Sequence, residues 1–353
     1  MPDTITQTLC EVVRQASEAS RPLQIQGNGS KSFYGPPGTG DKLSTSELSA
    51  IVAYEPSELF ITARAGTLLS EVEATLDDAN QILPFEPPHY GKQATIGGTV
   101  ACGLSGPRRP YSFAMRDCIL GTQLINGKGE HLTFGGQVVK NVAGYDVSRF
   151  MCGAMGTLGV ITEVSLKTIP KPESEITLVY EHMFEQASDF MQRLLQTNLP
   201  VTASYYENNC LYLRFAGNEN VIEKIKERLG GEQLDKSKQL WHSVKEQQRD
   251  FFESDKNLWR CMVPVNCGAL SISGESVCEW NGGLRWYTSD DDIRSVMKIT
   301  KSAGGYATLF RANSPLTHRF AEPAAALKKL HLKLKQAFDP DNILNPGRMY
   351  PWL

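Results

Sequence analysis

The sequence predicts an α+β protein of two domains, and three observations support this fold class. The chain has 353 residues, which exceeds the usual size of one domain. Glycine clusters adjoin hydrophobic runs between residues 94 and 170. After Pro172 the order strand–helix–strand–strand–helix is typical of a ferredoxin-like unit. We therefore expect a first domain at 1–171, a second, shortened domain at 172–322, and a C-terminal segment at 323–353 that returns to the first.

Composition and charge argue against two classes of protein. The net charge of −3 comes from 36 basic and 39 acidic residues that are interspersed, whereas non-specific nucleic-acid binding requires a basic face. No apolar run approaches the roughly 18–20 residues that span a bilayer, and the N-terminus lacks the basic start and apolar core of a signal peptide. We expect a cytoplasmic protein, peripheral at the cytoplasmic face of the inner membrane only through partners.

The eight cysteines are expected to be reduced thiols, mostly in apolar settings. They are scattered, no C-x-x-C pair occurs, and no run has the spacing of a zinc or iron–sulfur site. A cytoplasmic location also keeps thiols reduced. We expect no metal in this chain, so an iron–sulfur cluster that works with it would belong to another chain.

The elements of the first domain are predicted from periodicity and turn residues. A helix is expected over 4–17, because apolar side chains recur at helical spacing after Asp3 or Thr4 as the N-cap. The sequence Asn126-Gly127-Lys128-Gly129 is rich in residues that adopt positive φ, which indicates a β-hairpin. By these criteria, helices are also expected at 68–79, 99–102 and 146–151, and strands at 23–25, 42–45, 58–65, 82–85, 118–125, 130–134 and 160–168.

The second domain begins with the ferredoxin-like order and then continues with further strands. A charged helix is expected over 238–253. A second helix, expected over 290–303, is expected to be capped by Gly304-Gly305. The expected strands are 176–182, 201–207, 210–215, 259–263, 277–280, 284–287 and 306–311, and the other helices are 184–196, 221–229, 290–303 and 323–338.

Three glycine-rich loops are candidate binding sites for a polar ligand. In the first, Gly27 and Gly29 allow successive backbone N–H groups to point into one concavity, an arrangement that binds phosphate. In the second, Gly97-Gly98 at a helix start offers N–H donors and the positive end of a helix dipole. In the third, the backbone of a glycine turn at Gly156 can pair with an adenine edge. Each loop alone is equally compatible with an ordinary turn or helix start.

The order of these loops resembles the FAD-binding fold of the vanillyl-alcohol oxidase family, also called the PCMH type. That family has a glycine loop for the pyrophosphate, a second glycine cluster and a G-x-L-G-[VI]-[IV]-T segment, which 26–32, 94–98 and 156–162 match in order. The stretch 338–348 is similar to the FDPxxILNPG ending of flavin-dependent 2-hydroxy-acid dehydrogenases. The resemblance implies a two-subdomain FAD-binding domain with a small ferredoxin-like α/β cap. The residues it implies for FAD binding are Gln26, Gly27, Asn28, Gly29, Ser30, Lys31, Ser32, Thr95, Ile96, Gly97, Gly98, Thr99, Arg108, Asp146, Gly156, Gly159, Val160, Ile161 and Asn345.

Three further segments, 106–111, 116–117 and 134–146, look like the FAD-binding subunits of bacterial glycolate oxidase. This resemblance covers essentially the whole chain. It implies a complex with a larger FAD-binding subunit and an iron–sulfur subunit, which oxidises glycolate, a 2-hydroxy acid, to glyoxylate and passes electrons to the respiratory chain. Two alternatives stay open: a non-catalytic FAD-holding assembly or electron-relay subunit, and a stand-alone flavin oxidase of another 2-hydroxy acid.

Departures from the family pattern set two further expectations. The first loop has Ser30 and no histidine in the region where many relatives join the flavin covalently, so FAD is expected to be held non-covalently. The cap lacks the histidine-rich metal motif of larger relatives, which favours an assembly subunit over a stand-alone oxidase.

Oxidation of a hydroxy acid requires a base for the hydroxyl proton and a cation for the carboxylate. Arg285 and Arg311 are candidates for the carboxylate, because an arginine pairs with it in a directional, two-pronged way. Tyr287 and His318 are candidates for the acid or base. A structural salt bridge or a solvated position is the alternative for each arginine. Arg108, Arg109 and Lys140 are expected either to neutralise the pyrophosphate or to form a partner surface.

Overall fold

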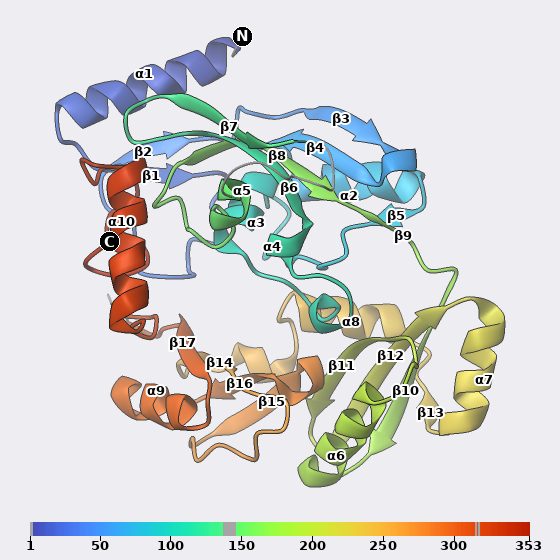
Figure 1. Ribbon diagram of the computed structural model, residues 1–353. Coiled ribbons are helices and arrows are strands. Elements are labelled where there is room, and N and C mark those ends of the chain that lie inside the picture. The colour runs from blue at the N-terminus through green and yellow to red at the C-terminus, as the bar shows by residue number, and fades with distance from the viewer. Residues whose placement is uncertain (1–2, 137–145, 315, 317) are drawn as a thin grey trace. The chain divides into compact units, whose positions relative to one another are not determined.

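The computed structural model describes residues 3–136, 146–314, 316 and 318–353, and the chain divides into two compact units. Unit 1 comprises Met1–Ser105, Ala114–Pro170 and Pro315–Leu353, and unit 2 comprises Gly106–Phe113 and Lys171–Ser314. Unit 2 is therefore an insertion in the sequence of unit 1 (Figure 1). These units differ from the expected domains in two places, since 106–113 belongs with unit 2 and the return to unit 1 begins before 323.

Unit 1 contains a five-stranded sheet with the order β3-β4-β8-β6-β7, in which all neighbours are antiparallel. The expected hairpin is confirmed, since β6 and β7 pair from Gly121↔Gly135 to Ile125↔His131. The strand β3 was not predicted from the sequence. The strands are β3 (Ile51–Glu55), β4 (Phe60–Arg64), β6 (Ile119–Ile125), β7 (His131–Gly135) and β8 (Val160–Lys167).

A separate pair of parallel strands, β1 (Leu23–Gln26) and β2 (Asp41–Ser44), leads into the first glycine loop. Helix α1 (Thr4–Glu18) begins where the carboxylate of Asp3 accepts a hydrogen bond from the backbone N–H of Thr6. The apolar face of α1 packs with β1 and the C-terminal segment in one buried core, which therefore supports the first loop from behind. This core contains Leu9, Val13, Ala16, Leu23, Leu43, Leu48, Ile125, Val160, Ile343 and Leu344.

The other elements of unit 1 are short, apart from two helices. The strand expected over 82–85 is only a two-residue strand, β5, which pairs with β9. The elements are α2 (Leu69–Asp78), β5 (Gln81–Ile82), α3 (Ile96–Cys102), α4 (Met115–Cys118), α5 (Val147–Phe150), β9 (Ile169–Pro170) and α10 (Ala325–Phe338).

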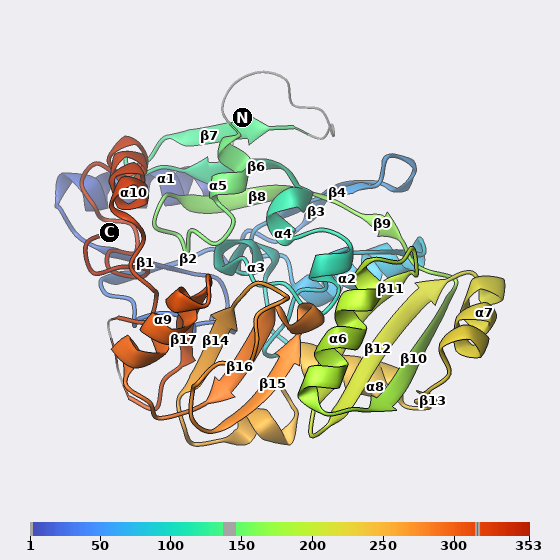
Figure 2. The same cartoon turned by 60° about the horizontal axis from the view of Figure 1, so that its bottom comes forward.

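Unit 2 is built on an eight-stranded sheet with the order β13-β10-β12-β11-β15-β16-β14-β17 (Figure 2). Its first half confirms the expected ferredoxin-like unit, because the second strand of the βαββαβ order lies at one edge and the fourth at the other. All neighbours in this half are antiparallel. Its elements are β10 (Ser174–Glu181), α6 (Phe184–Leu195), β11 (Val201–Glu207), β12 (Cys210–Gly217), α7 (Glu219–Leu229) and β13 (Glu232–Gln233).

The second half of this sheet has the same strand order read in the reverse direction across the sheet. The sequence did not reveal this repeat. Its second strand, β15, pairs with β11 of the first half at Tyr205↔Glu279 and Tyr206↔Cys278. The loop 263–274 stands where the first half has helix α6. The elements of this half are β14 (Leu258–Met262), β15 (Glu275–Glu279), β16 (Leu284–Thr288), α9 (Ile293–Ser302) and β17 (Tyr306–Arg311).

The charged helix expected over 238–253 is wrong, because the segment forms two helices. Helix α8 (Ser237–Lys245) ends before Gln247, whose φ of 55° lies in the left-handed region, and the 3-10 helix η3 (Asp250–Glu253) follows. Between them, the guanidinium of Arg249 pairs with the buried carboxylate of Glu207 on β11.

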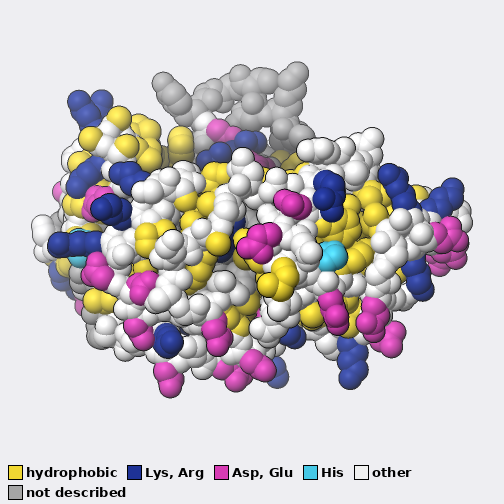
Figure 3. All heavy atoms as spheres, turned by 90° about the horizontal axis from the view of Figure 1, so that it is seen from below, with side chains coloured by type: hydrophobic (Ala, Val, Ile, Leu, Met, Phe, Trp, Pro, Cys, Tyr) yellow, Lys and Arg dark blue, Asp and Glu magenta, His cyan; other side chains and the backbone are white. Residues whose placement is uncertain are grey.

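No helix in the described ranges is long and apolar enough to cross a bilayer. Figure 3 shows one face of the molecule, on which basic and acidic side chains are interspersed, as the near balance of charges in the sequence predicts.

Candidate functional site

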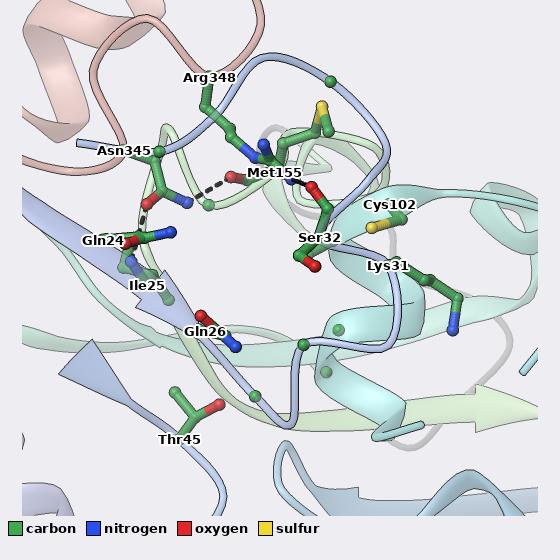
Figure 4. Close-up of a pocket in the computed structure, with 18 of the residues that line it drawn as sticks. Gln24, Ile25, Gln26, Lys31, Ser32, Thr45, Cys102, Met155, Asn345 and Arg348 are labelled. Carbon is green, nitrogen blue, oxygen red and sulfur yellow. Dashed lines mark hydrogen bonds between the residues drawn. The ribbon is translucent and has the colours of Figure 1, made fainter. Parts of the chain in front are cut away.

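A cavity of about 470 Å³ in unit 1 brings together the three predicted glycine loops and the C-terminal segment (Figure 4). Its volume is typical of a small-molecule site. The predicted residues that line it are Gln26, Gly27, Asn28, Gly29, Ser30, Lys31, Ser32, Thr95, Gly97, Gly98, Gly156, Gly159, Ile161 and Asn345.

The first loop presents a run of unpaired backbone donors to this cavity. Within the described part of the chain, the N–H groups of Gly27, Asn28, Gly29 and Ser30 donate to no acceptor. Gly29 has a φ of +75°, which a residue with a side chain rarely adopts. Successive N–H groups of this kind form a nest that fits the oxygens of an anion.

The N–H groups of the second loop already donate within the chain, and its glycines allow the backbone to lie close to neighbouring residues. The N–H of Gly97 donates to the carbonyl of Ala65 at 2.8 Å, and the N–H of Gly98 donates to the side chain of Thr95 at 3.3 Å. A Cβ on Gly97 would lie 2.6 Å from that of Ala65, and a Cβ on Gly27 would lie 2.5 Å from the hydroxyl of Thr95. The expectation that Gly97-Gly98 offers donors to a ligand is therefore wrong. Gly97 lets the start of α3 approach Ala65, and Gly27 lets the first loop approach Thr95 of the second.

Asn345 joins the first loop to the third. Its Oδ1 accepts a hydrogen bond from the N–H of Ile25 at 2.7 Å, and its Nδ2 donates to the carbonyl of Met155 at 2.6 Å (Figure 4). A Cβ on Gly156, which has a φ of +76°, would lie 2.5 Å from this Nδ2. The amide of Asn345 therefore positions the two loops at the edge of the cavity.

A buried ion pair fixes the segment that carries Asn345. The ammonium of Lys335 pairs with the carboxylate of Asp339 at 2.6 Å and donates to the carbonyls of Thr157 and Leu344, each at 2.9 Å. Asp339 also accepts from the backbone N–H groups of Ile343 and Leu344. Burial lowers the pKa of Lys335, although Asp339 opposes that shift. These contacts explain why the ending 338–348 contains an aspartate at this position.

Cationic side chains give the cavity a positive lining. Lys31, Arg319 and Arg348 line it, and no aspartate or glutamate does so among the described residues. Arg348 donates to the carbonyls of Ser32 and Tyr34 at 3.0 and 2.8 Å, and Arg319 donates to that of Phe33 at 2.8 Å. Burial lowers the pKa of both arginines. The two guanidinium groups therefore shape the first loop from the C-terminal side.

Sequence reasoning missed part of this lining. Arg348 directly follows the Asn345-Pro346-Gly347 motif, so its position was a usable signal, whereas nothing in the sequence around Arg319 distinguishes it. The missed lining residues are Gln24, Ile25, Phe33, Gly35, Pro37, Gly38, Thr45, Ala101, Cys102, Met155, Arg319 and Arg348.

Several predicted FAD residues lie outside the cavity lining. Ile96, Thr99 and Val160 are buried, and Thr99 accepts a hydrogen bond from Lys31 at 3.4 Å. Asp146 is exposed before α5 and pairs with Arg149.

The three basic residues expected at the pyrophosphate or at a partner surface are not among the lining residues either. Arg108 belongs to unit 2, where it pairs with Glu175 at 2.9 Å. Arg109 stacks over Trp280, also in unit 2. Lys140 lies outside the described residues, as does most of the stretch 140–146.

Two candidates for substrate chemistry share strand β16. Arg285 is buried and donates to the backbone carbonyls of Gly282, Gly268 and Cys267. Its guanidinium therefore holds the loop 263–274. Tyr287 is also buried, which raises the pKa of its hydroxyl to about 12.

The other two candidates lie outside strand β16. Arg311 on β17 donates to the carbonyl of Phe252 at 3.0 Å and to the side chain of Gln247. His318 is exposed and belongs to unit 1. Within unit 2, both predicted carboxylate ligands therefore donate to groups of the chain itself.

The cavity fits the pyrophosphate of a dinucleotide such as FAD. The unpaired N–H run of the first loop supplies donors, Lys31, Arg319 and Arg348 supply positive charge, and the glycines leave room for close approach. A dianionic ligand is stabilised by this arrangement.

Comparison with known proteins agrees with this geometry. Residues 4–135 match a family model described as an FAD binding domain. Glycolate oxidase subunit GlcE of Escherichia coli strain K12 is 45% identical over 345 residues, which are 98% of this chain and 97% of that protein. Glycolate oxidase subunit GlcD of Bacillus subtilis strain 168 is 24% identical over 99% of this chain and 89% of its own length.

Solved structures show the same fold at low sequence identity. A 4-ethylphenol oxidase from Gulosibacter chungangensis has a TM-score of 0.71 at 14% identity and is matched over 98% of this chain and 88% of its own. An alkyldihydroxyacetonephosphate synthase has a TM-score of 0.66 at 14% identity, over 96% and 74%. The expected α+β fold class and FAD as the cofactor are confirmed by these comparisons.

Proposed function

We propose that this chain, which belongs to the family of glycolate oxidase subunits that includes GlcE, oxidises glycolate to glyoxylate within a multi-subunit enzyme. The observation that carries the proposal is the 45% identity to GlcE along nearly the whole length of both chains. The cavity in unit 1 supports it, because its donors and cations fit FAD.

Each part of the cavity has a role in this proposal. The N–H groups of Gly27 to Ser30 would hold the pyrophosphate, with Lys31 and Arg348 as counter-charges. When bound, FAD supplies a hydride acceptor for the α-carbon of a hydroxy acid. The chain itself must orient that acid, bind its carboxylate and accept its hydroxyl proton.

The proposal includes non-covalent binding of FAD. The first loop offers no histidine. Cys102 is a thiol in the cavity lining, and its burial raises its pKa, which disfavours the reactive thiolate. An amide such as that of Asn345 cannot form the bond.

The proposed partners are a larger FAD-binding subunit and an iron–sulfur subunit, with electrons leaving towards the respiratory chain. The names of the GlcE and GlcD relatives as subunits support a multi-subunit enzyme. A cytoplasmic location, with membrane attachment only through these partners, is part of the proposal; the eight free cysteines support it.

A second function is an FAD-holding or electron-relay subunit without a substrate site. Two observations favour this second function. Arg285 donates to three backbone carbonyls, and Arg311 donates to Phe252 and Gln247. Neither predicted carboxylate ligand is therefore available to bind a substrate.

Anaerobic reduction by glycolate separates the two functions. We expect the purified chain to be yellow, acid precipitation to release all of its flavin, and glycolate to bleach the assembled complex far faster than the isolated chain. Flavin that stays in the acid pellet would contradict non-covalent binding, and Cys102→Ser would show whether that thiol holds it. Variants of this chain that retain FAD but lose bleaching in the complex support a substrate role. If the complex bleaches normally with every variant of this chain that retains FAD, the relay function is supported.

A further inference from the structure

We infer that unit 2 binds the carboxylate of a small hydroxy acid at Arg260 and Thr308, on the face of its sheet that faces away from helix α9. The inference rests on the proposed function and deepens it, because it names residues of this chain that would bind substrate. None of the sequence-predicted candidates lies in this pair.

The sheet register places Arg260 between two side chains on one face. Arg260, in the middle of β14, pairs with Trp286 of β16 on one side and with Thr308 of β17 on the other. Directly opposed residues of antiparallel strands project to the same face, with Cβ atoms about 4.5–5.5 Å apart. The next residue, Cys261, projects to the other face, where Thr300 of α9 contacts its sulfur at 3.7 Å.

Among the described residues, the contacts of the Arg260 guanidinium are with aromatic rings. Its guanidinium lies 5.3 Å from the ring centre of Trp280 and 6.0 Å from that of Trp286. It is half-buried, and no residue in the described part of the chain forms a hydrogen bond or ion pair with it. The five N–H donors are therefore pre-positioned for a ligand.

Thr308 adds a hydroxyl on the same face of the sheet, on the strand next to that of Arg260. The residue is only 4% exposed, yet its hydroxyl forms no hydrogen bond within the described residues and is not among the side-chain atoms closed off from solvent. A hydroxyl that solvent can reach can bond to either the carboxylate or the hydroxyl of a ligand.

This arrangement differs from that of three other arginines on the strands and loops of unit 2. Arg285 donates to three backbone carbonyls, Arg249 pairs with Glu207, and Arg214 donates to the hydroxyl and carbonyl of Thr202. The guanidinium N–H groups of Arg260 instead donate to no described residue.

The geometry selects a small, planar anion. An arginine fork matches the two oxygens of a carboxylate. Arg109, whose guanidinium lies 4.6 Å from the ring centre of Trp280, adds a second positive charge at the same indole. The rings of Trp280 and Trp286 flank Arg260, which favours a ligand with little bulk next to its carboxylate. A 2-hydroxy acid such as glycolate meets these requirements, and Thr308 offers a hydroxyl on the same face of the sheet to bond with its 2-hydroxyl.

Titration of the FAD-loaded full chain with glycolate tests the site without relying on turnover. Binding is measured by calorimetry and by the change in tryptophan fluorescence, since two indoles border Arg260. We expect Arg260→Met to raise the Kd for glycolate at least 30-fold and Thr308→Val to raise it about 5-fold, the loss of a charged and of a neutral hydrogen bond. Arg228→Met, an exposed arginine on α7, serves as the matched control and should change nothing.

Glycolamide, the neutral analogue of glycolate, gives the second control. We expect it to bind equally weakly to the wild type and to Arg260→Met, and Arg260→Lys to recover only part of the glycolate affinity. Thermal unfolding and FAD content of each variant show that the chain is folded. Equal Kd values of the folded wild type and Arg260→Met for glycolate would overturn the inference.

The failure of this inference can be told apart from the failure of the proposed function. If lactate or another small carboxylate binds in an Arg260-dependent way while glycolate does not, the site stands and glycolate as substrate is refuted. If the assembled complex oxidises glycolate with Arg260→Met as fast as with the wild-type chain, the proposed function stands and the site is refuted.

Discussion

Replacing Asn345 by alanine should open the FAD cavity from its C-terminal side. The substitution removes two hydrogen bonds and leaves the N–H of Ile25 and the carbonyl of Met155 without partners. Each buried, unsatisfied group costs about 1–3 kcal/mol. We therefore expect the free energy of unfolding of unit 1 to fall by about 2–6 kcal/mol, and the Kd for FAD to rise at least tenfold, because the first and third loops are no longer held together.

The matched control for this prediction is Asn208→Ala. Asn345 and Asn208 both have a positive φ, 42° and 49°, so alanine meets a similar backbone strain at both positions. Asn208 is exposed in the turn after β11, and its side chain forms no hydrogen bond with any residue that the structure describes. Urea unfolding followed by flavin and tryptophan fluorescence gives stability, and titration of the apoprotein gives the Kd for FAD. If Asn345→Ala matched Asn208→Ala in both quantities, the bridging role of Asn345 would be refuted.

Two other predictions concern the first loop and the N-terminal helix. Gly29→Val should abolish FAD binding, because valine disfavours a φ of +75° and would intrude on the run of N–H donors. The control is Gly91→Val, at a φ of +120° in open space outside the cavity, which should keep FAD. If flavin content showed that both variants retain FAD, the nest would be contradicted. Asp3→Ala should cost about 1 kcal/mol of unfolding free energy at pH 7. The hydrogen bond from the N–H of Thr6, aided by Arg64, holds the pKa of Asp3 below 3.8. The stabilisation is therefore present above that pH and is lost as the pH falls through the lower pKa of the folded state. The unfolding free energies of the wild type and Asp3→Ala, measured with urea, should differ at pH 5 and become more alike at pH 3.

Most of the secondary structure could be predicted because local signals were strong. Helical spacing of apolar residues located α1, α2, α6, α7 and α9, and the turn at Asn126-Gly127 located the hairpin of β6 and β7. The β3 strand escaped prediction because it is short and none of its residues is buried, so its sequence Ile-Val-Ala-Tyr-Glu lacks a clear alternation.

The repeat in unit 2 could not be predicted from local patterns. Its second half has the loop 263–274 where the first has a helix, so the order of elements along the chain conceals the shared sheet order. What organises this loop is Arg285, a buried arginine that bonds backbone carbonyls. A sequence does not distinguish such an arginine from one that binds a ligand.

The part of the candidate site that is formed by glycine-rich backbone could be predicted from the sequence. Glycine patterns identified the three loops that line the cavity. The cations Arg319 and Arg348 come from the C-terminal part and reach the first loop only in the folded chain, so spacing could not reveal Arg319. The hydrogen bonds of Arg285 and Arg311 could not be predicted for the same reason, because the partners of an arginine are a property of tertiary structure.

The bridge from Asn345 to Ile25 spans 320 residues of chain, and this has a consequence for biosynthesis. At about 5–20 residues per second, some 15–60 s pass on the ribosome between the emergence of the two residues. During that interval, unit 2 can be completed while the nest at Gly29 still lacks its brace. Tight uptake of FAD must then follow synthesis of Asn345, so the yellow colour of the protein reports that the chain has been made as far as this residue.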